Sequence, residues 1–176
     1  MKRFILTGTP GCGKTSILRA LEMRGHFVVE EAATDVIAYD QTNRIAEPWK
    51  NYTFIDDIIR LQKQRQIQVN EVPVAIQFFD RSPFCTYALA VYLGYKPSEI
   101  LMAEIDRALQ SQIYERRVFF IENLGFCTPT DARKISYEEA LRFEIIHKET
   151  YDKFGFDCVM IPSGVLEERV ERVVSA

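Results

Sequence analysis

The most constraining feature of the sequence is the segment Gly8-Thr9-Pro10-Gly11-Cys12-Gly13-Lys14-Thr15, near its start. It fits the pattern Gly-x-x-x-x-Gly-Lys-Ser/Thr in full. An apolar run typical of a strand precedes it, and an amphipathic segment of helical period follows it. In that context the pattern forms a loop that wraps backbone N–H groups around a phosphate. The sequence therefore predicts a strand, a phosphate-binding loop and a helix in direct succession.

Each residue type in this segment suits the binding of a nucleotide's phosphate tail. Glycines adopt the dihedral angles of a tight loop and let the main chain approach closely, and the following helix N-terminus attracts an anion. We expect Lys14 to reach the β- and γ-phosphates of ATP or GTP, and the Thr15 hydroxyl to ligate Mg²⁺. The expected nucleotide-binding residues are Gly8, Thr9, Pro10, Gly11, Cys12, Gly13, Lys14, Thr15 and Ser16.

The rest of the chain alternates short apolar runs with longer segments of helical period, which is typical of a parallel sheet covered by helices. The runs are continuous rather than alternating, as expected for strands buried on both faces. The expected strands are Arg3 to Thr7, Phe27 to Glu30, Val74 to Phe79, Arg117 to Ile121 and Cys158 to Ile161. The pattern predicts a three-layer α/β fold.

Capping residues mark several expected helix boundaries. Ser82 followed by Pro83 indicates an N-cap with proline at the first helical position, and Ser136 with Glu139 forms a capping-box pair. The expected helices begin at Lys14, near Phe54, after Ser82, after Ser98, after Ser136 and near Val165.

Length and composition narrow the class of protein. The 176 residues fit one domain spanning the chain, and the net charge of -3 gives no general support for nucleic-acid binding. The four cysteines form no Cys-x-x-Cys pair, which favours reduced thiols and a cytoplasmic location. No apolar stretch is long enough to cross a membrane. Neither the cysteines nor the two histidines indicate catalysis.

Carboxylates follow three of the expected strands, where ligands of parallel sheets bind. Asp80 ends a strongly apolar run, and this position favours a magnesium ligand acting through water. Arg81 comes next, where its charge would hold a substrate group or stabilise a transferred phosphoryl. The alternative is that both residues only cap the helix that follows Ser82.

Glu31 is the expected general base, placed to accept a proton from an attacking hydroxyl or to orient a water. Glu30 is the competing choice, since one residue of an acidic pair commonly starts the next helix, where the dipole favours negative charge. Glu122, after the fourth strand, is a weaker candidate. The sequence alone does not decide between Glu30 and Glu31.

A long polar loop between Glu122 and Ser136 indicates a lid. Arg133 is its leading candidate to neutralise charge on the triphosphate while the closed lid excludes water. The alternative is a solvated loop with ordinary surface charges. Trp49 and Tyr52 could stack on a base, although aromatic side chains serve more often in packing.

The motifs GTPGCGKTS, VVEEA and FFDRSP, with the C-terminal stretch HKETYDKFGFDCVMIPSGVLEERVERV, resemble the small AAA-type ATPase-like P-loop family related to nicotinamide riboside kinases. The Asp-Arg-Ser triplet also looks like the strand-end motif of deoxynucleoside kinases. The resemblance covers nearly the whole chain. It implies a P-loop NTPase fold of the nucleoside or nucleotide kinase kind, with five parallel strands in the order 2-3-1-4-5. It also implies functional positions at Glu31, Asp80, Arg81 and Arg133.

Two functions from different classes are consistent with these features. The first is a phosphotransferase that passes the γ-phosphoryl of ATP, bound with Mg²⁺, to a small hydroxyl acceptor such as a nucleoside. The second is a nucleotide-dependent switch or weak NTPase that controls a protein partner through its lid. The carboxylate at Glu31 favours the first, because it lies beside the expected position of in-line attack.

Overall fold

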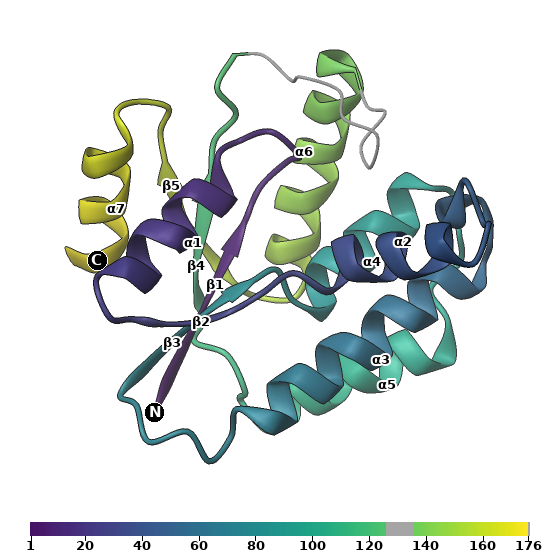
Figure 1. The fold of residues 1–176 in the computed structure, drawn as a ribbon, viewed down its shortest axis with the longest axis horizontal. Helices are drawn as coiled ribbons and strands as arrows, with labels where there is room; N and C mark the ends of the chain where they lie inside the picture. Colours follow the sequence, from purple (N-terminus) through teal and green to yellow (C-terminus); the bar gives the residue numbers. More distant parts are fainter. Residues whose placement is uncertain (126–135, 176) are drawn as a thin grey trace.

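Five parallel strands form the centre of the molecule, in the order β2-β3-β1-β4-β5 (Figure 1). The computed structural model describes residues 1–125 and 136–175. The strands are β1 (Lys2–Thr7), β2 (Phe27–Val29), β3 (Ile76–Asp80), β4 (Arg117–Ile121) and β5 (Asp157–Ile161). The order and the parallel pairing confirm the expected fold class, and each strand lies within two residues of its expected position.

Seven α-helices connect and follow these strands within the described residues. They are α1 (Lys14–Met23), α2 (Ala32–Thr42), α3 (Thr53–Gln68), α4 (Pro83–Tyr92), α5 (Glu99–Gln110), α6 (Tyr137–Lys153) and α7 (Leu166–Ser175), with a 3-10 turn at Pro48–Lys50. The sequence predicts every one except α2. That helix buries only Ala32 and Val36, so its apolar spacing is too weak to be visible in the sequence. In this part of the chain no helix is long and apolar enough to span a bilayer.

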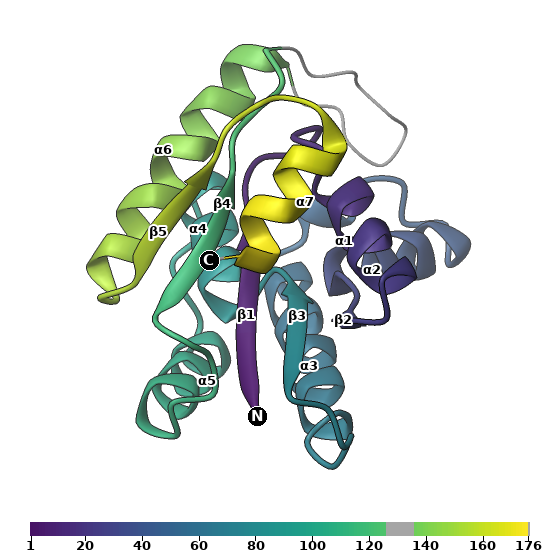
Figure 2. The same cartoon turned by 90° about the vertical axis from the view of Figure 1, so that its left-hand side faces the viewer.

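The helices cover the sheet in two unequal layers (Figures 1 and 2). α1 and α7 pack on one face, against Leu6, Phe78 and Phe119. α3, α4 and α5 pack on the other face, against Ile5 and Phe79. Neighbouring residues of a strand point to opposite faces, so Leu6 and Ile5 belong to different layers. Both faces are apolar, and this explains why the strands read as continuous rather than alternating apolar runs.

The register of the strands places their carboxyl ends at one edge of the sheet. Leu6 of β1 pairs with Asp80 of β3, and Val29 of β2 pairs with Phe79. The phosphate loop begins two residues after Leu6, and the two glutamates directly follow Val29. Glu31 and Arg81, 50 residues apart in the sequence, therefore meet beside the loop.

The helix starts were predicted correctly in position, but one cap differs in its bonding. The Ser136 hydroxyl accepts from the Glu139 N–H at 3.2 Å and the Glu139 carboxylate accepts from the Ser136 N–H at 2.7 Å, which confirms the capping box. Ser82 occupies the N-cap of α4, but its hydroxyl makes no capping bond. It lies 2.9 Å from the Tyr151 hydroxyl instead, because the position is buried and offers a tertiary partner.

We expect Ser136→Ala to lower the free energy of unfolding by about 1 kcal/mol, because the variant loses one half of the capping box. Chemical denaturation followed by circular dichroism measures the difference. Ser163→Ala, at an exposed position outside the helices, is the matched control and should change little. Equal stability of Ser136→Ala and the wild type would contradict the contribution assigned to this cap.

Candidate active site

The phosphate loop is shaped by glycines at positive φ. Gly8, Gly11 and Gly13 have φ angles of 136°, 81° and 85°. A Cβ on Gly8 would lie 2.3 Å from the carbonyl oxygen of Ile121 at the end of β4, so only glycine fits there. A Cβ on Gly13 would lie 2.9 Å from a guanidinium nitrogen of Arg169. The loop is thus held tightly against the sheet and α7.

Lys14 begins α1, and its side chain folds back over the loop. The side chain is buried, with the Nζ atom 3.4 Å from the carbonyl oxygens of both Gly8 and Thr9. Gly13 occupies the helix N-cap and supplies no side chain to satisfy the N–H groups of the first turn. The helix dipole, these N–H groups and the Lys14 ammonium combine positive charge at one place, which suits a phosphate anion.

Arg169 of α7 forms a hydrogen bond with the backbone of the phosphate loop. This buried residue of α7 donates from Nη1 to the carbonyl oxygen of Cys12 at 2.9 Å and from Nη2 to that of Glu122 at 3.0 Å. It therefore joins the phosphate loop to the segment that leaves β4. Sequence reasoning missed Arg169, because nothing in the local pattern of a C-terminal amphipathic helix shows which charged residue turns inward.

Thr15 and Asp80 line one cavity of about 350 Å³, together with Glu31. The hydroxyl of Thr15 and the carboxylate of Asp80 are hard oxygen donors, the kind that Mg²⁺ prefers. Among the described residues no group of three or more His, Cys, Asp and Glu side chains forms a metal cage. A site with few protein ligands still fits Mg²⁺, which usually keeps several waters and binds phosphate oxygens. The residues present therefore fit this ion.

Two donors among the described residues hold the Glu31 side chain. Its Oε1 forms an ion pair with Arg81 Nε, and its Oε2 accepts from the Thr34 hydroxyl at 2.8 Å. Arg65 donates to the Glu31 carbonyl oxygen at 2.7 Å, which fixes the backbone at the start of α2. Glu30 is exposed and pairs with Arg19 at 2.5 Å on the surface of α1. Of the two acidic residues, it is Glu31 that shares a pocket with Arg81.

Arg81 has an unusual backbone and a buried side chain. Its φ is 70°, and its N–H donates to the carbonyl oxygen of Leu6 at 3.0 Å. Burial works against the charge of the guanidinium, but Glu31 and other nearby acidic groups raise its pKa above the ordinary value. A non-glycine residue at positive φ is costly and persists where the surrounding contacts fix it. Arg81 is therefore a charged group held in one place.

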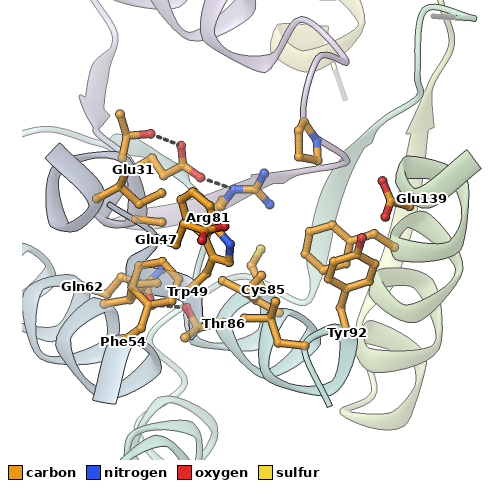
Figure 3. Close-up of a pocket in the computed structure, with 18 residues that line it drawn as sticks. Glu31, Glu47, Trp49, Phe54, Gln62, Arg81, Cys85, Thr86, Tyr92 and Glu139 are labelled. Carbon is orange, nitrogen blue, oxygen red and sulfur yellow. Dashed lines mark hydrogen bonds and ion pairs between the residues drawn. The ribbon is translucent and has the colours of Figure 1, made fainter. Parts of the chain in front are cut away.

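A pocket of about 370 Å³ opens beside Glu31 and Arg81 (Figure 3). Pro10 of the phosphate loop lies on its wall, so the pocket adjoins the loop. Its other lining residues include aromatic and polar side chains: Trp49, Phe54, Tyr92, Phe143, Gln62, Thr86, Glu47 and Glu139. Thr86 donates to Gln62 Oε1 at 2.8 Å, which orients the amide of Gln62.

The structure brings most of the expected site residues together. Trp49 lines the pocket, whereas Tyr52 is 76% exposed and is not among the lining residues. Cys12 is buried within the loop, and Ser16 lies exposed on the first turn of α1. Arg133 and most of the expected lid lie outside the described residues. The roles assigned to these side chains remain predictions.

A family model described as an AAA domain matches residues 3–169. The chain belongs to this AAA domain family. This confirms the resemblance seen in the loop and strand-end motifs. No curated protein sequence gives a significant match.

Solved structures of deoxyadenosine kinase from M. mycoides share the fold of this AAA domain protein. The complex with dATP superposes with a TM-score of 0.63 at 13% identity, covering 98% of this chain and 97% of that one. The complex with dCTP gives 0.62 at 16% identity, covering 99% and 97%. The complex with the products dCMP and dCDP gives 0.61 at 14% identity, covering 98% and 97%. Identities this low establish the likeness of fold alone.

His147 gives this AAA domain protein a pH-dependent stability. Burial, and after it the charge of Arg81, lower the pKa of His147 to about 3. An unfolded histidine titrates near pH 6.5, so below that pH the unfolded chain binds a proton that the native protein does not. Stability contributed by the neutral ring is therefore lost as the pH falls from about 6.5 towards 3.

We expect the wild type to lose about 2 kcal/mol more of its unfolding free energy than His147→Gln between about pH 7 and pH 5. Urea denaturation at the two pH values measures this difference. Comparing the change with pH, rather than the absolute stability, cancels any packing cost of the substitution. His26→Gln, at the other histidine, is the control. Parallel pH dependences of the wild type and His147→Gln would contradict the assignment.

Proposed function

We propose that the protein is an ATP-dependent phosphotransferase that moves the γ-phosphoryl to a hydroxyl of a small acceptor such as a nucleoside. The observation that carries this proposal is the pocket of about 370 Å³ that has Pro10 of the phosphate loop, Glu31 and Arg81 on its wall. An acceptor in this pocket lies next to the phosphates of a nucleotide in the loop. A switch that only binds and releases nucleotide requires no second pocket at this position.

The donor side of the reaction uses the loop and the start of α1. The backbone N–H groups of the loop and the Lys14 ammonium bind the phosphates. Thr15 and Asp80 would hold Mg²⁺, which when bound would neutralise charge on the β- and γ-phosphates. GTP fits the same loop, because a loop of this kind reads phosphates and not the base.

In the transfer of the γ-phosphoryl group, Glu31 acts as the general base. The acceptor oxygen attacks the γ-phosphorus, the bond from that phosphorus to the β–γ bridging oxygen breaks, and ADP leaves. The hydroxyl proton passes to the Glu31 carboxylate, which Thr34 and Arg81 hold in a fixed orientation. The Arg81 guanidinium adds positive charge where negative charge develops on the transferred group.

The lining of the pocket favours an acceptor without a phosphate group. Glu31, Glu47 and Glu139 bring three carboxylates to the wall, and Arg81 is the only cation among its described lining residues. Because that cation already pairs with Glu31, the described lining offers little positive charge to a phosphorylated acceptor. Trp49 and Phe54 provide aromatic surface for a planar ring, and Gln62 provides an amide for hydrogen bonding. The kinase fold of the structural neighbours supports the same choice of a nucleoside.

The decisive experiment is transfer of labelled γ-phosphate from ATP or GTP, with Mg²⁺, to a panel of nucleosides, nucleoside monophosphates and other alcohols. We expect label on an unphosphorylated acceptor and a loss of about 100-fold or more in kcat for Glu31→Gln. Glu30→Gln is the matched control and tests the competing carboxylate. Slow release to water regardless of acceptor would contradict the proposal and support a nucleotide-dependent switch.

Lys14→Ala should weaken ATP binding about 10- to 100-fold, because charged hydrogen bonds to the phosphates are lost. Asp80→Asn should raise the Mg²⁺ concentration required for half-maximal activity more than it changes nucleotide affinity. Calorimetry with and without Mg²⁺ separates the loss of nucleotide affinity expected in Lys14→Ala from the loss of Mg²⁺ affinity expected in Asp80→Asn. Lys96→Ala removes the same charge at an exposed position and is the control. Full ATP affinity in Lys14→Ala would refute the assignment of the loop.

A further inference from the structure

His147 lies buried on α6, next to the candidate active site, with an exposed fraction of 0%. Its Nδ1 is 2.9 Å from the carbonyl oxygen of Phe143, one turn earlier in the same helix. Its Nε2 is 3.3 Å from Nη1 of Arg81. The ring also packs on Phe143, with 4.2 Å between the ring centroids. His147 therefore contacts the guanidinium that pairs with Glu31.

The partners of the two ring nitrogens decide the tautomer. A backbone carbonyl oxygen only accepts hydrogen bonds, so Nδ1 must carry the proton and donate to Phe143. A guanidinium only donates, so Nε2 must be unprotonated and accept from Arg81. One neutral form of the imidazole satisfies both contacts. A doubly protonated ring would instead direct an N–H at the guanidinium, and burial together with the Arg81 charge opposes this form.

The guanidinium of Arg81 is thus held at two different nitrogens. Nε pairs with Glu31 Oε1, and Nη1 donates to His147 Nε2. Because the guanidinium is planar, contacts at two of its nitrogens fix both its position and its rotation about the side chain. Glu31 is the N-cap of α2 and His147 lies on α6, so Arg81 joins the two sides of the site.

We propose that His147 is a positioning residue that holds Arg81 in the orientation in which it pairs with Glu31. This inference rests on the proposed phosphotransfer, in which Glu31 accepts the proton and Arg81 stabilises the transferred group. Without the acceptor at Nε2 the guanidinium keeps its contact with Glu31 at Nε but loses the contact at Nη1 that fixes its rotation. Nothing in the local sequence around His147 indicates that it faces Arg81, which lies 66 residues away.

Two isosteric substitutions separate the two hydrogen bonds. Glutamine can place an amide oxygen near the position of Nε2 and accept from Arg81, whereas asparagine can place an amide nitrogen near Nδ1 and donate to Phe143. We expect His147→Asn to lower kcat about 10- to 100-fold, the effect of removing a hydrogen bond to a charged group. His147→Gln should retain kcat within about threefold. The KM for ATP should stay unchanged in both, because neither alters the phosphate loop.

A purely structural role gives a different result. It would lower the activity of the two variants in parallel with their thermal stability, and His147→Gln would not be the more active. Equal activity of His147→Asn and the wild type would also overturn the proposal. His26→Gln is the control, because His26 packs at the edge of Phe78 away from the pocket residues.

A measurement independent of turnover separates this proposal from the proposed function. In His26→Gln a single histidine remains, so its nitrogen-15 resonances are assigned directly. We expect a protonated Nδ1 and an unprotonated Nε2 near neutral pH, with a shift of the Nε2 resonance in Arg81→Lys. If no acceptor is phosphorylated but these resonances are found, the proposed function fails while the contact that orients Arg81 is confirmed. A proton on Nε2 would overturn the inference whatever the activity.

Discussion

The pairing of β1 with β3 is the constraint on which the rest of the site depends. Leu6 lies opposite Asp80, and the pairing continues one residue further because the Arg81 N–H donates to the Leu6 carbonyl oxygen at 3.0 Å. This last bond holds Arg81 at a φ of 70°, where β3 ends. A shift of one residue would move Asp80 and Arg81 away from the phosphate loop and exchange the two faces of β3. The correct register thus positions both Asp80, the candidate metal ligand, and Arg81, the cation expected to contact the substrate.

The site keeps several ionisable groups away from water by pairing opposite or complementary groups. Glu31 and Arg81 form an ion pair, and His147 stays neutral because burial, and after it the charge of the guanidinium, lowers its pKa. Lys14 lies over backbone carbonyl oxygens of the loop. Buried charges are costly to leave unpaired, so each of these contacts restricts where its neighbour can lie. The resulting rigidity is what phosphoryl transfer requires, since its catalysis depends mainly on positioning and electrostatics.

The features that depend on local sequence were the ones that could be predicted. The phosphate loop, the five strands, the capping box at Ser136 and the strand-end position of Asp80 all follow from short patterns. The strand order came from the family resemblance. Features that depend on distant partners could not be predicted. The Ser82 hydroxyl faces Tyr151, and His147 faces Arg81, at separations of 69 and 66 residues. The preference for Glu31 over Glu30 also required knowing that Arg81 lies beside it.

The bond between Arg169 and the phosphate loop has a consequence for the order in which the protein matures. Its donor and acceptor are separated by 157 residues, so the carbonyl oxygen of Cys12 receives this partner only after α7 has been synthesised. A nascent chain on the ribosome already contains the whole loop motif while lacking the side chain that supports it. The packing of the loop therefore depends on a helix translated 157 residues later, and a chain arrested before α7 carries the motif without its support.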